Sequence, residues 1–492
     1  MSNPIITFAT MKIKAILFLS VLLLFNWRFI FAQEALVILQ PMTLEACIDY
    51  ALNNNVAIKQ AELNTELSNI DLVQSKTNLL PSINANASHS YNYGRTIDRF
   101  TNQFASQKVL SQNLSLSSDI TLFGGLQTIN AIQQNQFVYL ASKYDVDKIK
   151  NDISLNVASS YLQILFDIEN VESALNQLEI TSAQVERTKK NVELGAAAKG
   201  ALLDIQAQFA LEELNHTNAQ NSLDISYLSL AQLLNLKLTK SFNIVKPDLA
   251  IVNESMLTAD VDQIYNTAIN NLPEIKSAEL KVKSSEKAID IALGGFSPRL
   301  LFSAAYGTGY SGLSKKIVGF PTFQGYAADG SFTSIGDTVF SPVFSNPLTE
   351  KNSFVDQYRD NVNKSFGFFL TVPIFNRFQT KLNVDKARIQ KLNAELNVKS
   401  TKLQLEKIIQ QSFVDVICGL KKYNATLKKV AAMKESFKYI EQKFNLGMLN
   451  TNEYNDSKNK LAKSESDLLQ AKYECVFKSK VLDFYLGKPL KL

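Results

Sequence analysis

The chain contains one unit twice, and this duplication constrains its fold more than any other feature of its 492 residues. "AIKQAEL" at 57–63 matches "EIKSAEL" at 274–280, which lies 217 residues further along. "LFGG" at 122–125 matches "IFNR" at 374–377 at a spacing of 252, and later matches keep that spacing. The predicted boundaries are 42–238 for the first repeat, 239–259 for an inter-repeat linker and 260–488 for the second repeat.

Both copies have the same inner order of elements. The order is a helical stretch, two strands separated by a loop, a very long helix, a glycine-containing turn, and a helix of about half that length. In the first and second copy the predicted ranges are 45–79 and 262–295 for the first helix, 82–93 and 299–310 for the first strand, 112–123 and 365–375 for the second strand, 126–192 and 378–444 for the long helix, and 201–236 and 453–486 for the last helix.

The predicted strands alternate between apolar and small polar residues. In "PSINANASHSYNY" at 81–93, Ile83 and Ala85 begin an apolar face, while Asn84 and Asn86 begin a face of Asn and Ser. This two-residue period is typical of a strand. Strands of roughly ten residues with one apolar and one polar face suit a transmembrane barrel around water. The alternative is a small soluble sheet with one face on a core.

Four strands cannot close a barrel alone, and an open strand edge cannot lie in lipid. The barrel must therefore be shared between chains. Two chains would give about eight strands, whose side chains fill the interior, whereas three would give about twelve strands with room for water. We therefore predict a mainly α fold with a transmembrane β part, in which four strands per chain contribute to a shared trimeric barrel of about twelve strands.

The long helices carry a heptad pattern, in which apolar residues step by three and four. Tyr161 and Ile164 belong to it in the first copy, and Ile409 and Phe413 in the second. Heptads predict coiled-coil packing, and the glycine turns make each pair of helices antiparallel. A helix of about 65 residues is roughly 100 Å long, which no globular core requires. Helical columns from three chains would continue the barrel of strands as an α-barrel, although a soluble coiled-coil rod would explain the helices alone.

The N-terminus predicts export. Lys12 and Lys14 precede an apolar run at 15–25, and Ala32 offers a small residue at a cleavage point. This combination is typical of a secretory signal peptide, predicted here as residues 1–32.

The composition offers little material for catalysis. The net charge is +5, with Lys and Arg dispersed among Asp and Glu, which argues against nucleic acid as a partner. Two His and three Cys leave little for a metal site or a catalytic pair. Gly195 and Gly200 have the spacing of a phosphate-binding loop but lack its Lys and Ser or Thr. We predict no enzyme, cofactor or metal, and we expect Cys418 and Cys475 to be buried free thiols although export permits a disulfide.

With these features the chain resembles the TolC-type outer-membrane efflux protein family. The resemblance rests on "TLEACIDYALNNNVAIKQAEL" at the start, "LFGG" and "IFNRF" after the second strands, and "LG" at both helical turns. It implies a homotrimeric channel-tunnel with a β-barrel in outer-membrane lipid of a Gram-negative bacterium and an α-barrel in the periplasm. It implies two partners, a periplasmic adaptor (membrane fusion) protein and an inner-membrane transporter, for efflux or type I secretion. It also implies an equatorial position for the linker 239–259.

The resemblance makes the helical turns the candidate sites, with the adaptor docking at residues Leu194, Gly195, Ala196, Leu446, Gly447 and Met448. The family's aperture carboxylates lie six and nine residues beyond the second turn's glycine, where this chain has Glu453 and Asp456; Asp204 lies nine beyond the first glycine. Three copies would form an acidic ring that favours cations. Ala201 and Leu449 depart from the family pattern, which leaves the gating residues open.

Both sets of residues also have purely structural explanations. Glycine suits a left-handed helix end, and acidic residues early in a helix favour its dipole. Two other functions stay open as well: a structural coiled-coil protein of the envelope, and a surface adhesin or receptor that uses the long loop 311–364. The sequence does not identify the transported substrate.

Overall fold

The computed structural model describes residues 41–98, 100–102, 104–105, 108–236, 242–247 and 260–491. The predicted signal peptide 1–32 lies outside them, as does most of the predicted linker. The chain divides into two compact units. In the described part of the smaller unit, Met42 and Ile244 form a parallel bridge. The larger unit contains all the helices and strands that follow.

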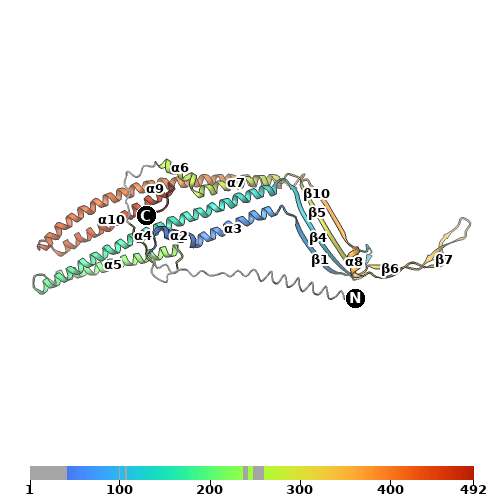
Figure 1. Ribbon diagram of the computed structural model, residues 1–492, viewed down its shortest axis with the longest axis horizontal. Coiled ribbons are helices and arrows are strands. Elements are labelled where there is room, and N and C mark those ends of the chain that lie inside the picture. The colour runs from blue at the N-terminus through green and yellow to red at the C-terminus, as the bar shows by residue number, and fades with distance from the viewer. Residues whose placement is uncertain are drawn as a thin grey trace, which may run out of the picture. The chain divides into compact units, whose positions relative to one another are not determined.

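The larger unit is mainly helical (Figure 1). Its helices are α2 (Leu44–Asn54), α3 (Val56–Thr77), α4 (Gln127–Glu193), α5 (Lys199–Leu233), α6 (Val261–Asn271), α7 (Pro273–Gly294), α8 (Phe354–Asp360), α9 (Gln379–Asn445) and α10 (Thr451–Tyr485). Helices α4 and α9 each have 67 residues, and α5 and α10 each have 35, so the helical hairpins of the two copies have equal lengths. Among the described helices, none combines the length and the apolar character needed to cross a bilayer.

The first helical stretch of each copy is divided in two, which differs from the single stretch that the sequence predicts. In the first copy the break is at Asn55, whose side chain accepts a hydrogen bond from the backbone N–H of Ala57 and caps α3. In the second copy the break is at Leu272, because Pro273 has no N–H to continue helix α6 and instead starts α7.

The four main strands form one antiparallel sheet in the order β1 (Ser82–Asn92), β4 (Val109–Gly124), β5 (Arg299–Ser311) and β10 (Asn363–Thr371). The register aligns their small polar residues on one face: Asn84 pairs with Ser117, Ser117 with Ala305, and Ala305 with Ser365. The pair β4–β5 joins the two copies. Strands β1 and β10 are therefore the two open edges.

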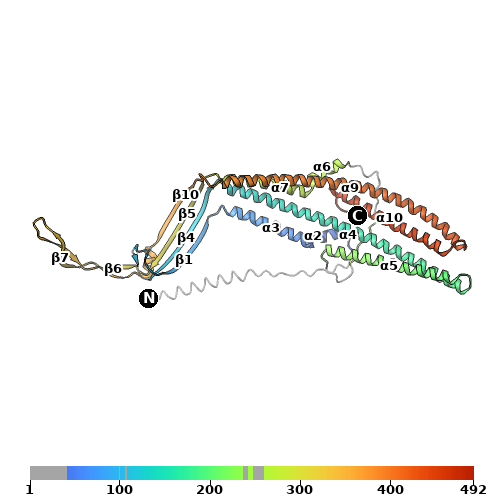
Figure 2. The same ribbon diagram turned by 180° about the vertical axis from the view of Figure 1, so that it is seen from behind.

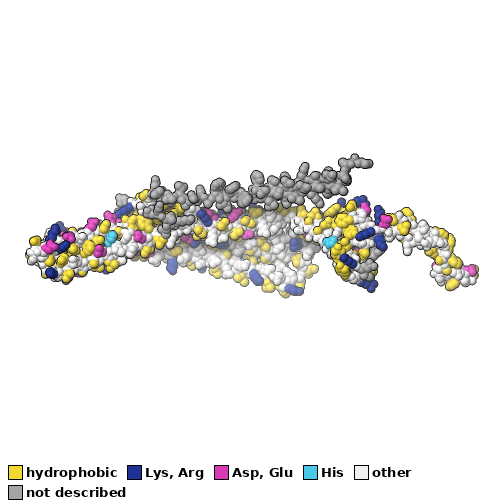
Figure 3. Space-filling view, turned by 90° about the horizontal axis from the view of Figure 1, so that it is seen from below, with side chains coloured by type: hydrophobic (Ala, Val, Ile, Leu, Met, Phe, Trp, Pro, Cys, Tyr) yellow, Lys and Arg dark blue, Asp and Glu magenta, His cyan; other side chains and the backbone are white. Residues whose placement is uncertain are grey.

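The opposite, apolar face of the sheet is exposed. Ile83 is 69% exposed, Phe366 80% and Leu370 66%. Figure 3 shows hydrophobic side chains over the helices and over the sheet, with Lys and Arg gathered near one end of the sheet. Since these side chains stay exposed, the described residues do not supply the core that a soluble sheet would require.

The loops beyond the outer end of the sheet contain short elements. The first loop holds β2 (Thr96–Ile97) and β3 (Phe104–Ala105). The second holds α8 and two small sheets, formed by β6 (Lys315–Gly319) with β9 (Leu348–Lys351) and by β7 (Phe323–Phe332) with β8 (Thr338–Phe344). Gln357 on α8 attaches this loop to the sheet, because its side chain accepts from the Ser311 N–H and donates to the Ser311 carbonyl.

The helices pack as two antiparallel hairpins, α4 with α5 and α9 with α10 (Figures 1 and 2). The heptad residues Tyr161, Ile164, Ile409 and Val416 are buried. Both long helices begin after a residue in the left-handed region, Leu126 with φ 59° and Phe378 with φ 58°. These two residues lie 252 apart, so the duplication extends to the backbone conformation of the strand-to-helix turn.

The hairpin turns share one hydrogen-bonding pattern, the Schellman motif. Gly195 (φ 75°) donates to the Val192 carbonyl, and Ala196 donates to the Asn191 carbonyl. In the second hairpin the same two bonds run from Gly447 (φ 72°) to Phe444 and from Met448 to Lys443. The motif satisfies the last carbonyls of α4 and α9 and reverses the chain within a few residues.

The cysteines are free thiols, but the prediction that both Cys418 and Cys475 are buried is wrong for one of them. Cys475 and Cys47 are buried, whereas Cys418 is exposed. Cys418 lies on α9 between the buried residues Val416 and Leu420, and its own side chain faces solvent. Burial raises the pKa of the Cys47 thiol to about 12, so this thiol is unreactive at neutral pH.

The turn glycines generate a stability prediction. Gly195→Ala should lower the free energy of unfolding by about 1–2 kcal/mol, because an L-residue is strained at this left-handed position. No steric clash contributes, since a Cβ at Gly195 would meet nothing within 4 Å. Chemical denaturation followed by circular dichroism would measure the change.

The matched control is Gly200→Ala, five residues further along in helix α5. A Cβ there also meets nothing within 4 Å, but the residue is helical, so alanine should raise stability by up to about 1 kcal/mol. Equal effects of the two substitutions would contradict the assigned role of Gly195.

Candidate functional site

The two hairpin turns present apolar side chains to solvent. Leu194 is 81% exposed, and Leu446 and Met448 are each 72% exposed. Gly195, Gly447 and Ala196 are exposed as well. Leucine and methionine at such positions do not stabilise the hairpin itself, and clustered exposed apolar residues mark contact surfaces. The six candidate docking residues therefore lie at the turns of the two hairpins, three at each turn.

The three candidate aperture carboxylates lie just beyond these turns, and all are exposed. Asp204 is on α5, whereas Glu453 and Asp456 are on α10. Glu453 is in the first turn of α10, where the Asn450 side chain accepts from its backbone N–H at 2.8 Å. Asp456 forms an ion pair with Lys460 at 2.6 Å. A single chain thus distributes the carboxylates over two hairpins.

The hairpins contact each other through polar side chains. Gln184 on α4 donates to the Tyr454 hydroxyl on α10 at 2.6 Å. One turn away, the Lys458 ammonium donates to Thr181 Oγ1 at 2.5 Å and to the Gln177 carbonyl at 3.4 Å. Lys458 is 3% exposed, and burial lowers its pKa from the ordinary value.

A second polar group links α5 to α10. Gln208 donates both to Asn459 Oδ1 at 2.9 Å and to Glu212 Oε1 at 2.6 Å. Asn215 donates to the other Glu212 oxygen at 3.2 Å. Gln208 and Glu212 are buried. The carboxylate of Glu212 is therefore held by amide donors at the contact between the hairpins.

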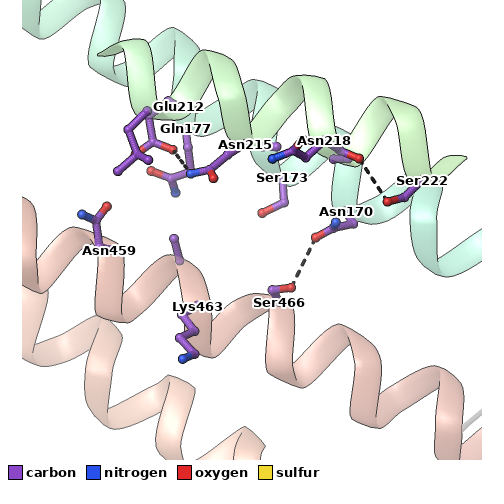
Figure 4. Close-up of a pocket in the computed structure, with 14 residues that line it drawn as sticks. Asn170, Ser173, Gln177, Glu212, Asn215, Asn218, Ser222, Asn459, Lys463 and Ser466 are labelled. Carbon is purple, nitrogen blue, oxygen red and sulfur yellow. Dashed lines mark hydrogen bonds between the residues drawn. The ribbon is translucent and has the colours of Figure 1, made fainter. Parts of the chain in front are cut away.

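A cleft of about 490 Å³ opens beside these contacts (Figure 4). It is lined by α4, α5 and α10, and Ser466 on α10 donates to Asn170 on α4 across it at 3.3 Å. The labelled lining residues are Asn170, Ser173, Gln177, Glu212, Asn215, Asn218, Ser222, Asn459, Lys463 and Ser466. Polar lining of this kind suits water and hydrogen-bonding groups.

The contact inside the second hairpin, between α9 and α10, is different in kind. Tyr454 stacks on Phe444 with ring centroids 4.4 Å apart, and Phe437 lies 5.4 Å from the same ring. Between the hairpins, by contrast, the Gln177, Gln184 and Asn455 side-chain oxygens are buried without a hydrogen-bond partner. Such groups destabilise a contact. Aromatic stacking thus joins α9 to α10, whereas polar side chains and the Phe166–Tyr473 ring pair join α4 to α10.

The sequence analysis missed this polar contact, which we call the hairpin seam and define by Gln177, Thr181, Gln184, Gln208, Glu212, Tyr454, Lys458 and Asn459. The heptad pattern reports only the helix faces packed inside a hairpin. The sequence carries no distinct signal for it, because its polar residues lie both on heptad positions, as Glu212 does, and between them, as Lys458 does. In the part of the chain that the structure describes, no group of three His, Cys, Asp or Glu side chains could hold a metal ion.

Comparison with known proteins supports the same architecture. The chain is 20% identical over 420 residues to the outer membrane protein TolC of Salmonella enteritidis, covering 84% of this chain and 75% of that protein. It is 20% identical over 404 residues to the Escherichia coli TolC, covering 81% and 73%.

Solved structures of channels share the fold. The outer membrane protein VceC of Vibrio cholerae superposes with a TM-score of 0.70 at 14% identity, covering 91% of this chain and 96% of that one. The CmeC outer membrane channel of Campylobacter jejuni gives 0.68 at 17% identity, covering 90% and 85%.

The model of the family described as outer membrane efflux protein matches this chain twice, at residues 47–236 and 264–488. The two matches fall one in each copy of the duplicated unit and together cover most of the chain. The chain therefore belongs to the outer membrane efflux protein family and is an efflux channel protein of the outer membrane.

Proposed function

We propose that three copies of this chain close into one channel that crosses the outer membrane and extends into the periplasm as a helical tunnel. The channel would conduct substrates passively after an inner-membrane transporter and a periplasmic adaptor deliver them. One observation carries the proposal. Because the two copies are equivalent, a contact from the first copy to the second should recur with the copies exchanged. The contacts β4–β5 and α4–α7 join the copies, but their equivalents, β10–β1 and α9–α3, do not occur among the described residues of one chain.

The strands provide the first missing counterpart. Strand β5 of the second copy pairs with β4 of the first copy. The equivalent pair in the duplicated unit is β1 with β10, but in one chain these strands lie at opposite edges of the sheet. Their unpaired N–H and C=O groups cannot be left in lipid. Pairing β10 of one chain with β1 of the next supplies the missing contact and removes both edges.

The helices provide the second missing counterpart. Helix α7 packs against both long helices, α4 and α9, whereas its counterpart α3 packs against α4 and makes no comparable contact with α9 in the described residues. The uncovered surfaces are apolar. On α3, Leu63, Leu67 and Ile70 are 53–66% exposed; on α9, Ile389, Leu392 and Leu396 are 58–63% exposed. These two stripes would meet between neighbouring chains.

The number of chains follows from the strands. Four strands per chain give about twelve in a trimer, the smallest ring that leaves room for water inside the barrel. The polar face, with Asn84, Ser117, Ala305 and Ser365 in one row, would line that water. The apolar face would meet lipid.

The duplication also predicts the register between chains. Residues of β4 have their equivalents in β10 at a spacing of 252, and residues of β1 have theirs in β5 at 217. Ser118 pairs with Ala304 where the copies join. Their equivalents are Leu370 and Ala87, which would therefore pair between chains. This register keeps the polar faces of both strands on the same side, whereas a slip by one residue would reverse them.

A cysteine pair tests this contact. In a Cys418→Ser background, Leu370→Cys with Ala87→Cys should oxidise to covalent dimers and trimers on a non-reducing gel, because directly paired residues have Cα atoms about 4.5–5.5 Å apart. The matched control, Leu370→Cys with Ala85→Cys, shifts the partner by two residues on the same face and should react far less. If the pair at positions 370 and 85 gave the main cross-linked product, the register would differ by two residues from the predicted one. If neither pair gave a product, pairing of β1 with β10 between chains would be contradicted.

At the ends of the hairpins away from the sheet, the turns would dock the adaptor through Leu194, Leu446 and Met448. The two hairpins would separate at the hairpin seam when the tunnel opens, because breaking this contact exposes polar groups and little apolar surface. Glu453 and Asp456 would then face the ions that enter the tunnel. Three copies of each would concentrate negative charge there and favour cations.

Single-channel recording in a planar bilayer tests the aperture. Glu453→Gln combined with Asp456→Asn should lower the preference for K⁺ over Cl⁻ several-fold, because a carboxylate ring attracts cations. Asp467→Asn is the control, since Asp467 lies on the same helix and pairs with Lys429, away from the turn. Unchanged selectivity in the double variant would remove these residues from the aperture.

A further inference from the structure

Two exposed lysines lie at the outer end of the sheet, away from the helices, where Figure 3 shows Lys and Arg gathered. Lys108 immediately precedes β4, and Lys364 is the second residue of β10. Lys364 pairs with Tyr306 on β5, and its ammonium lies 5.9 Å from the centroid of that ring. The alternation along β10 places Lys364 on the same face as Phe366 and Leu370, the apolar face of the sheet.

The Lys108 ammonium lies on this apolar face as well, because it contacts the aromatic rings at the end of β1. It is 4.1 Å from the centroid of the Tyr91 ring and 5.6 Å from that of Tyr93. Both tyrosines share the face of Ala87 by the two-residue period of a strand. Aromatic rings with lysines beside them are expected where the wall of a barrel passes from hydrocarbon to lipid headgroups.

The charge around the two lysines is positive. Neither forms an ion pair among the described residues, and the apolar face of the four main strands carries no acidic residue. The acidic residues of α8, Asp356 and Asp360, pair with Arg359. Asp98 is buried and accepts a hydrogen bond from the hydroxyl of Ser311, which is on the polar face. The two ammonium groups are therefore available to an anion.

The register proposed between chains brings the two lysines together. That register pairs Leu370 with Ala87 of the next chain. Six residues further out, antiparallel pairing places Lys364 opposite Tyr93 of that chain. Directly opposite residues have Cα atoms about 4.5–5.5 Å apart. Lys364 of one chain and Lys108 of the next would therefore flank the same tyrosine ring.

We propose that Lys364 of one chain and Lys108 of the next bind the phosphate headgroup of a lipid in the outer leaflet, at each boundary between chains. This inference rests on the proposed trimer and its register. Lysine binds phosphate as a point charge, and basic residues at a membrane surface attract anionic headgroups. The apolar face beside the lysines contacts the acyl chains of the same molecule. A free phosphate ion lacks this second contribution, so the site selects a lipid.

Native mass spectrometry of the detergent-solubilised protein tests the site, with bis-phosphorylated lipid A as the probe. Wild type should bind one molecule per chain. Lys108→Gln combined with Lys364→Gln should raise the dissociation constant about tenfold, equivalent to about 1.4 kcal/mol, because both positive charges beside the phosphate are lost. Inorganic phosphate at the same concentration should not displace the lipid. Displacement would contradict a lipid site and indicate a site for the free ion.

Lys315→Gln combined with Lys316→Gln is the matched control. It removes the same charge from β6, beyond the same end of the sheet but outside the four main strands, and should leave lipid binding unchanged. Equal binding by the wild type and the variant at positions 108 and 364 would overturn the inference. Equal losses in the two double variants would also overturn it, because they would indicate general attraction of an anionic lipid. If the double variant does not assemble, Lys364→Gln alone carries the same comparison.

The same spectra separate this inference from the proposed function, because they count chains as well as bound lipids. Wild-type trimers that retain no lipid A would overturn the lipid site alone. Wild-type protein that consists of single folded chains would overturn the proposed trimer itself.

Discussion

The backbone N–H and C=O groups at the edge of a strand in lipid have no water to hydrogen-bond with. The rest of the structure depends on this constraint. Every unpaired backbone N–H or C=O in hydrocarbon costs several kcal/mol. Strands β1 and β10 are the two edges of the sheet, and this sheet has an exposed apolar face. The chain cannot satisfy them by folding back on itself, because the two edges belong to one four-stranded sheet. Its duplicated sequence, in which β4–β5 has an equivalent in β10–β1, makes other copies of the same chain the natural partners.

The helical part uses two kinds of contact for two purposes. Inside the second hairpin, the stacking of Phe444 on Tyr454 contributes cohesion between α9 and the 35-residue helix α10. Between the hairpins, the Lys458 ammonium donates to the Thr181 hydroxyl and the Glu212 carboxylate accepts from Gln208. Three buried side-chain oxygens there have no partner among the described residues. A contact of this second kind adds little net stability, because buried polar groups recover only part of their hydration.

Much of the fold could be predicted from the sequence, because each main element occurs twice and its pattern can be compared between the two copies. Strict alternation identified the strands, and heptads identified the hairpins. The breaks at Asn55 and Pro273 were missed although both residues are local signals, a helix cap and a missing N–H donor. The hairpin seam could not be derived, because periodicity reports which residues face inward within a hairpin but not which hairpin lies beside it.

The central claim is that one chain is an incomplete part of a closed structure. Native mass spectrometry of the protein released from detergent tests it most directly, because the method counts the chains in the intact particle. We expect a dominant species with three times the mass of one chain, stable until the complex is unfolded. A folded species with the mass of a single chain, under conditions that preserve other membrane oligomers, would contradict it.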